Sequence, residues 1–255
     1  LQFEDIIGYD EVKVKLGKVL GFAKPESRNA LRHFGISSSM GGVLLYGPPG
    51  NSKTRLVMAA ASTYSLPVIS LSVADVYSAY VGNAEAEIRR AFRLARQAHP
   101  CVLFLDELDA LVTDRGTGCS SSSNVESRVL ASLLTEMDGI DGAADDVFVV
   151  AATNRLESID AALLRKGRFH HILHVSLPTM EARHDMVNYF GDKYSLSETV
   201  RKKISHKLTD LMSGADVENL CREEGMNRIK SFIIGNTGDV SVDVSPTVDS
   251  LIGSP

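Results

Sequence analysis

The chain has 255 residues, of which 44% are hydrophobic, enough for one substantial core and a smaller second one. Its formal net charge of −5 leaves no general basic surface, and neither an arginine-rich patch nor a platform of stacking aromatics is visible, so a direct nucleic-acid partner is disfavoured. No apolar run approaches the roughly 20 residues that cross a bilayer and no signal peptide is visible, so we expect no membrane insertion.

The first informative element is a glycine-rich loop between a strand and a helix. The apolar stretch 43–46 predicts a strand, and the loop 47–54 that follows reads GPPGNSKT. A phosphate loop lays backbone N–H groups around phosphates, then places a lysine on the β/γ oxygens and a hydroxyl on Mg²⁺. Lys53 and Thr54 fit these two roles. The residues expected to contact a nucleotide here are Pro49, Gly50, Asn51, Ser52, Lys53, Thr54 and Arg55.

One residue of this loop departs from the template G-x-x-x-x-G-K-[ST]. The sixth position is normally glycine, and here it is Ser52. If this residue adopts a left-handed conformation, its Cβ costs about 1–2 kcal/mol. We expect such a cost to weaken nucleotide binding at most. The alternative for the whole loop is a Gly/Pro turn that happens to precede a lysine.

A second buried strand ends in acidic residues. Residues 101–105 are continuously apolar, as expected for a strand covered on both faces, and DELD follows at 106–109. We expect Asp106 to bind Mg²⁺, directly or through water, and Glu107 to polarise the attacking water. An acidic pair after a strand is by itself more often a solvated strand end. The phosphate loop earlier in the chain favours the metal site.

The remaining pattern predicts an α/β fold with a small second subdomain. Apolar runs alternate with helical segments over residues 1–178, which predicts a parallel sheet with helices on both faces. Residues 179–255 predict a small helical lid, with an irregular tail from Gly235 onward, where Gly, Ser, Asp and Pro dominate. The expected lid helices cover 181–191, 197–209 and 216–234.

Taken in order, these motifs resemble an ATPase module of the AAA family, in the branch of valosin-containing protein and N-ethylmaleimide-sensitive fusion protein. The match runs over about 3–230. The resemblance implies a P-loop NTPase fold that binds ATP with Mg²⁺. Segment 5–13 resembles the N-terminal segment that contacts adenine, and it contributes Gly8, although Ile7 stands where the family usually has glycine.

The motif SGADV at 213–217 resembles the start of the lid helix that packs against the nucleotide in this branch. The resemblance implies nucleotide contacts at Gly214 and Ala215. Ser213 or Asp216 would serve near the N-terminus of this helix, where a capping or acidic residue suits the helix dipole.

The resemblance also implies how hydrolysis is completed. Asn154, after the apolar run 147–152, matches the polar residue called sensor 1, which positions the attacking water and reads the γ-phosphate. Arg165 and Arg168 match the two arginines that reach into the neighbouring subunit's ATP site, where a guanidinium supplied in trans offsets charge on the transferring phosphoryl group. The alternatives are an Asn turn and a basic helix end at the surface.

Tyr80 and Val81 match the first pore loop of the family, which grips an extended polypeptide by apolar contact and stacking, with little demand on its sequence. Residues 113–123 would form the second pore loop, and 137–140 resemble the segment that signals between subunits. A tyrosine that is simply packed is the alternative. The resemblance therefore implies a hexameric ring that hydrolyses ATP to unfold, thread or remodel protein substrates.

The expected partners are a polypeptide in the pore, neighbours in a homo-hexamer or tandem ring, and adaptor proteins recruited by domains outside this chain. The Ser52 variant resembles the second module of the ribosome-maturation ATPases, known through diazaborine resistance and as spermatogenesis-associated proteins.

Two other functions stay open. One is a nucleotide-binding structural or regulatory ring subunit with little hydrolysis, which Ser52 alone supports. The other is a microtubule-severing ATPase, which should have basic pore loops, whereas Ala79 and the serine-rich second loop lack that charge.

The cysteines indicate the compartment. Cys101, Cys119 and Cys221 have no metal-ligand spacing, and one lies in a predicted core strand, so a reducing compartment fits best. We expect a cytoplasmic protein, with the nucleus as the alternative. The chain begins at Leu1 rather than methionine, and we expect it to be part of a longer protein.

Overall fold

The structure is a computed structural model that describes residues 1–24, 26–27, 30, 33–34, 41–78, 84–111, 122–141 and 147–235. Several expectations fall outside these residues. They concern Tyr80 and Val81, most of the second expected pore loop, Cys119, and the tail after Gly235.

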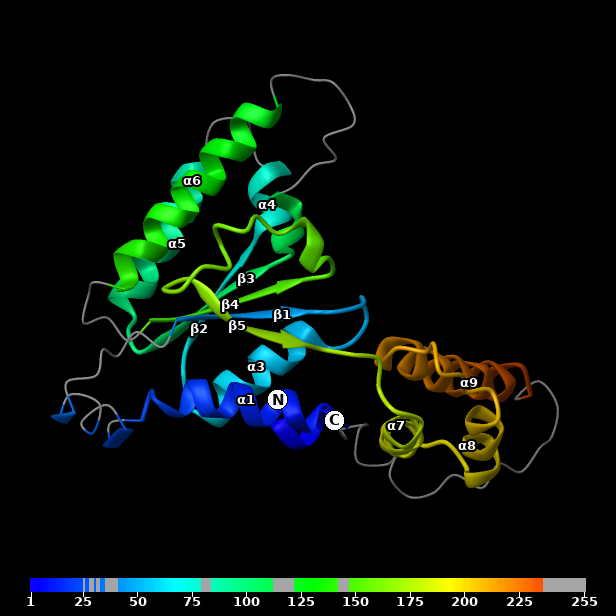
Figure 1. Ribbon diagram of the computed structural model, residues 1–255. Helices are drawn as coiled ribbons and strands as arrows, with labels where there is room; N and C mark the ends of the chain where they lie inside the picture. Colours follow the sequence, from blue (N-terminus) through cyan, green and yellow to red (C-terminus); the bar gives the residue numbers. More distant parts are fainter. Residues whose placement is uncertain are drawn as a thin grey trace, which may run out of the picture.

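Five parallel strands form one sheet in the order β2-β3-β4-β1-β5 (Figure 1). The strands are β1 (Gly42–Tyr46), β2 (Val68–Ser72), β3 (Cys101–Asp106), β4 (Val147–Thr153) and β5 (Phe169–His174). Tyr46 pairs with Thr153, and Leu105 pairs with Ala151. The carboxyl ends of β1, β3 and β4 therefore meet at one edge, where ligands bind in open α/β sheets. The predicted P-loop NTPase α/β fold is confirmed.

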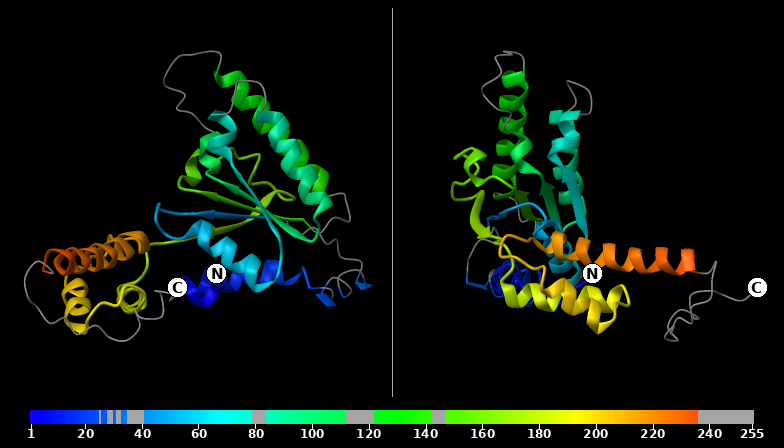
Figure 2. Two further views of the ribbon diagram at one scale, coloured as in Figure 1. Left: turned by 180° about the vertical axis from the view of Figure 1, so that it is seen from behind. Right: turned by 90° about the vertical axis from the view of Figure 1, so that its right-hand side faces the viewer.

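Helices cover both faces of the sheet (Figure 2). Successive side chains of a strand point to opposite faces, and all three central residues of β1 are buried. Val43 and Leu45 pack with α1 and α3, whereas Leu44 packs with α4, α5 and α6. These helices are α1 (Asp10–Gly21), α3 (Lys53–Thr63), α4 (Val73–Ser78), α5 (Ala84–Gln97) and α6 (Ser122–Asp141). The short 3₁₀ helices are η1 (Phe3–Asp5), η2 (Leu108–Leu111) and η3 (Leu156–Ser158).

The sequence of α5 shows how a helix is fitted to its face of the sheet. Its buried residues are Ala84, Ile88, Ala91, Phe92 and Ala95. They recur every three or four residues, so they form one apolar stripe along the helix. The polar residues between them face away from the core, which is why this segment is stable as a covering layer and not as a strand.

The lid consists of α7 (Met180–Lys193), α8 (Glu198–Ser205) and α9 (Gly214–Gly235), placed beside the sheet (Figure 1). The expected boundary at 178/179 falls between β5 and α7, and the Thr179 hydroxyl accepts a hydrogen bond from the Ala182 N–H to cap α7. Val187, Ile204 and Val217 belong to a separate buried cluster that joins the three helices. This second core makes the lid a small packed unit of its own.

The middle lid helix is shorter than the sequence predicted. It ends at Ser205, whereas the expected helix ran to residue 209. The N–H groups of Lys207 and Leu208 bond to carbonyl oxygens three residues back, at Ile204 and Ser205. These tighter turns end the α-helix and lead the chain into the segment before α9.

Candidate functional site

The phosphate loop leaves the carboxyl end of β1 and has a backbone that requires glycine at two points. Gly47 has a φ of 151°, and a Cβ there would lie 2.1 Å from the carbonyl oxygen of Val175. Gly50 has a φ of 78°, and its Cβ would lie 2.6 Å from the Ser213 Oγ. Side chains at these positions would push the loop away from Val175, which follows β5, and away from the lid. The two glycines therefore allow the loop to approach both closely.

Ser52 adopts the left-handed backbone conformation in which its Cβ is expected to cost energy. Its φ is 59° and its ψ is 25°, and its side chain makes no capping hydrogen bond. Its carbonyl oxygen accepts a hydrogen bond from the Leu56 N–H at 2.8 Å, so Ser52 forms the N-cap of α3. The expected penalty of about 1–2 kcal/mol for a Cβ in this region therefore applies.

Lys53 is buried and holds the loop to a neighbouring strand. Its Nζ donates to the carbonyl oxygens of Gly47 at 2.8 Å and Pro48 at 2.9 Å, and to the Asn154 Oδ1 at 2.7 Å. Burial lowers the pKa of Lys53 below its usual range, although the negative charges of Asp106 and Asp109 oppose this effect. The ammonium group thus lies among neutral oxygens with carboxylates nearby, a setting in which phosphate oxygens would stabilise its charge.

Thr54 and Asp106 lie together, as a shared metal site requires. The Thr54 Oγ1 donates to the Asp106 Oδ2 at 2.8 Å, and the other oxygen of Asp106 accepts from the Glu107 N–H at 2.9 Å. A hydroxyl and a carboxylate oxygen are hard ligands of the kind Mg²⁺ prefers. Glu107 is exposed and has a φ of 55°, an uncommon conformation of the kind found at functional sites.

Asp109 is a supporting residue whose role the sequence reasoning missed. Its Oδ1 accepts from the Thr153 Oγ1 at 3.0 Å and from the Asn154 N–H at 3.3 Å. It thereby fixes the end of β4, from which the Asn154 side chain reaches Lys53. The available signal was its place shortly after a buried strand, because the ends of neighbouring parallel strands converge.

These groups line one pocket with a volume of about 380 Å³, between the carboxyl edge of the sheet and the lid. The predicted nucleotide-site residues that line it are Pro49, Gly50, Asn51, Ser52, Lys53, Thr54, Arg55, Asp106, Glu107, Asn154, Gly214 and Ala215. Gly8 is not among the lining residues, and a Cβ there would lie 3.3 Å from the Cβ of Ala182 in α7. Its neighbours Asp5, Ile6 and Ile7 do line the pocket.

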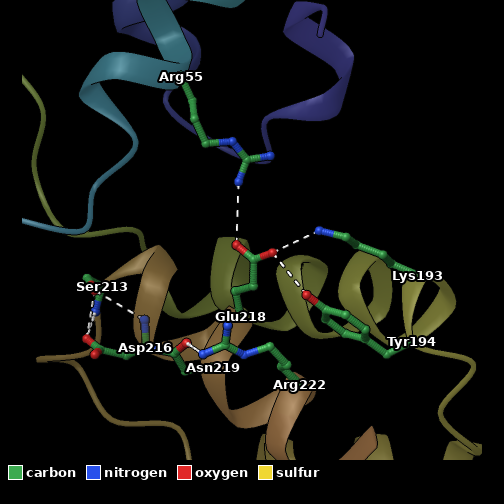
Figure 3. A network of polar contacts seen from close by, with 8 residues as sticks. All are labelled: Arg55, Lys193, Tyr194, Ser213, Asp216, Glu218, Asn219 and Arg222. Carbon is green, nitrogen blue, oxygen red and sulfur yellow. Dashed lines mark hydrogen bonds and ion pairs between the residues drawn. The ribbon is translucent and has the colours of Figure 1, made fainter. Parts of the chain in front are cut away.

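The lid wall begins with a well-capped helix (Figure 3). Asp216 accepts hydrogen bonds from the Ser213 N–H at 2.8 Å and the Ser213 Oγ at 2.7 Å, and its own N–H bonds back to that Oγ. The Ser213 hydrogen bonds lower the pKa of the Asp216 carboxyl. The Ala215 N–H then donates to the Gly50 carbonyl oxygen at 3.1 Å, which joins α9 directly to the phosphate loop.

Other lining residues come from parts of the chain that no motif marked. Met186, Tyr189 and Phe190 of α7 and Glu218 of α9 complete the lid side of the pocket. Asn51, although part of the predicted loop, is fully buried: its Nδ2 donates to the Val175 carbonyl oxygen at 3.3 Å. The sequence had predicted only that these lid residues lie in helices.

The two arginines expected to act in trans differ in their surroundings. Arg168 donates to both carboxylate oxygens of Asp138, at 2.8 and 2.9 Å, and to the Ala162 carbonyl oxygen at 2.7 Å. Arg165 is exposed, and its side chain has no hydrogen bond or ion pair within the described part of the chain. Neither arginine lines the pocket of its own chain. Their action on a neighbouring subunit stays a prediction.

No helix in the described ranges is both long and apolar enough to span a bilayer.

Comparisons with known proteins give relatives for almost the whole chain. Cell division control protein 48 homolog B of Arabidopsis thaliana is 43% identical over 91% of this chain and 38% of its own length. ATPase family gene 2 protein of Schizosaccharomyces pombe is 40% identical over 89% of this chain and 27% of its own length. ATP-dependent zinc metalloprotease FtsH of Cyanidium caldarium is 35% identical over 99% of this chain and 41% of its own length. The chain thus spans less than half the length of these relatives.

The family comparison agrees with the geometry of the pocket. The family described as "ATPase family associated with various cellular activities (AAA)" matches residues 43–177, which is more than half of the chain. This range contains the phosphate loop, the acidic end of β3 and Asn154. The resemblance drawn from the motifs is confirmed, and the chain belongs to the AAA family as an ATPase domain similar to Cdc48 and ATPase family gene 2 proteins.

Proposed function

We propose that this domain uses ATP hydrolysis to unfold, thread or remodel protein substrates or complexes, as one module of a larger hexameric ring. The observation that carries the proposal is the convergence of two polar pairs in one pocket. Lys53 contacts Asn154, and Thr54 contacts Asp106, although these residues come from the ends of two strands, β3 and β4, and from the first turn of α3. Such a set supports binding of a nucleoside triphosphate and attack on its γ-phosphate by water.

In this proposal the residues have separate roles. Lys53 binds the β- and γ-phosphate oxygens, and Thr54 with Asp106 would hold Mg²⁺, which neutralises phosphate charge when bound. Glu107 takes a proton from the attacking water. Asn154 has an amide with both donor and acceptor atoms; its oxygen binds Lys53, so its NH₂ group remains to orient the water or the γ-phosphate.

The ring is supported by the placement of the arginines. Arg165 is exposed and makes no side-chain hydrogen bond or ion pair within the described residues, so its guanidinium is available to a second copy of the domain. Arg168, held by Asp138, keeps the adjoining segment in place. Arg165 would then complete a neighbour's site, while Arg168 would reach that site only by exchanging its bond to Asp138. Adaptor proteins bound through further domains would select the substrate.

The protein substrate is supported by the sequence at Tyr80 and Val81, which match a pore loop that grips extended polypeptide. One relative is named an ATP-dependent metalloprotease, and this name supports an ATP-driven activity on protein. A structural or regulatory ring subunit with little hydrolysis is the second candidate, because Ser52 carries a strained backbone in the phosphate loop.

The test is ATP hydrolysis measured against protein concentration, with mass determined at each concentration. Arg165→Ala is compared with Lys166→Ala, a matched control because Lys166 is the adjacent exposed basic residue. We expect turnover to rise as hexamers form, and Arg165→Ala to abolish it without loss of assembly, while Lys166→Ala keeps it. Assembled protein that binds ATP but shows no turnover would contradict the motor and favour the structural subunit.

A further inference from the structure

Glu218 links two parts of the molecule that lie on opposite sides of the nucleotide pocket (Figure 3). It lies on α9, one turn after the cap formed by Ser213 and Asp216. One of its carboxylate oxygens is used inside the lid, and the other faces the helix that follows the phosphate loop. Because its two oxygens face different parts of the molecule, Glu218 can connect the lid to α3, a role that no sequence motif indicated.

The lid holds Glu218 in one orientation. Its Oε1 accepts hydrogen bonds from the Lys193 Nζ at 2.9 Å and from the Tyr194 hydroxyl at 3.1 Å, both at the end of α7. Burial favours the protonated carboxyl, but the hydrogen bonds and the charges of Lys193 and Arg55 outweigh it, so the pKa of Glu218 is lowered. Charge is therefore favoured on this carboxylate, and its hydrogen bonds to the lid fix its orientation.

The free oxygen of this carboxylate points at Arg55. The Glu218 Oε2 lies 3.6 Å from an Nη1 of Arg55, which belongs to the first turn of α3, two residues after Lys53. Both side chains line the pocket. Their contact is close in sequence to the hydrogen bond from Ala215 to Gly50, so a neutral hydrogen bond and a charged contact between described residues both join the lid to the phosphate-loop segment.

We propose that Arg55 and Glu218 form a bridge that keeps the lid closed on the phosphate-loop helix and slows release of the nucleotide. Both residues position the lid and do not act on the reacting atoms, because their charges act on each other across the pocket. The inference rests on nucleotide binding in this pocket and is independent of threading. It gives Arg55 a different role from the direct nucleotide contact that the sequence predicted.

The size of the effect follows from the exposure of the pair. The Arg55 and Glu218 side chains are 38% and 28% exposed, so solvent screens their attraction, and such pairs change an equilibrium by about two- to fivefold. Lid opening must break this contact together with the neutral bond. We therefore expect a modest acceleration of nucleotide release that becomes smaller as salt concentration rises.

The experiment measures ADP dissociation from the full chain by chasing fluorescently labelled ADP with unlabelled ADP, at low and high salt. The variants are Arg55→Gln, Glu218→Gln, the double variant and Arg55→Lys. Lysine should restore the bridge, because the contact is a single ion pair and needs only a positive charge. The matched control is Glu224→Gln, which removes a comparable α9 carboxylate that pairs with Lys207 and does not line the pocket.

We expect dissociation to be about two- to fivefold faster in each single Gln variant, with no further change in the double variant. Glu224→Gln should behave like the unaltered chain, Arg55→Lys should release ADP more slowly than Arg55→Gln, and melting temperatures report any general loss of stability. Unchanged release in both Gln variants, additive effects in the double variant, or an equal effect of Glu224→Gln would overturn the bridge. If the unaltered chain binds no ADP, the proposed function fails as well.

Discussion

The serine before the phosphate-loop lysine offers the sharpest test of the loop geometry. Ser52→Gly removes a Cβ from a left-handed residue with a φ of 59°. Relief of that strain favours the folded state by about 1–2 kcal/mol, while the extra freedom of glycine in the unfolded chain opposes it by about 0.4–1 kcal/mol. The expected net result is an increase of up to about 1.5 kcal/mol in the free energy of unfolding.

Urea unfolding of three variants separates the causes. Ser52→Ala keeps the Cβ and loses a hydroxyl that makes no capping hydrogen bond, so its stability should stay close to that of the unaltered chain. Ser65→Gly is a matched control: Ser65 is exposed, has a φ of 54° and lies outside the pocket, so glycine should stabilise the fold without affecting ATP binding. A Ser52→Gly variant less stable than Ser52→Ala would refute the strain argument.

Three further predictions concern other residues of the site. Glu107→Gln should lower ATP turnover by about 10²-fold or more while ATP still binds, because the general base is lost; unchanged steady-state hydrolysis in assembled protein would contradict this role. Asp109→Ala should lower kcat more than ATP affinity, because Asn154 loses its backbone anchor; a calorimetric ATP titration with steady-state kinetics separates the two, and unchanged kcat would argue against anchoring. Because folding lowers the pKa of Asp216, its ionised carboxylate stabilises the fold at pH values above 3.8, the ordinary pKa of the group. This contribution is lost as pH falls through the lower pKa of the folded state. Asp216→Asn should therefore reduce the dependence of urea unfolding on pH below about 4, and an unchanged dependence would count against the cap.

The sequence predicted the parts of the site that are continuous in the chain. The loop 47–54 and the acidic end of β3 each need specific residue types at neighbouring positions, so a short pattern carries their chemistry. The three lid helices were also predicted, and each expected range overlaps a helix of the structure. The end of α8 was placed too late, since the tight turns at Lys207 and Leu208 depend on backbone hydrogen bonds that leave little mark on residue type.

The sequence by itself therefore determined the fold class, the phosphate loop and the acidic strand end, because these depend on local patterns of apolar, glycine and charged residues. Only the tertiary structure showed that Asp109 anchors Asn154, that Asp138 holds Arg168 and that Glu218 faces Arg55. Each of these contacts joins residues far apart in the chain. The physical reason is that a charged side chain looks alike in sequence whether it faces water or a partner, and only the packing of the sheet and the lid selects that partner.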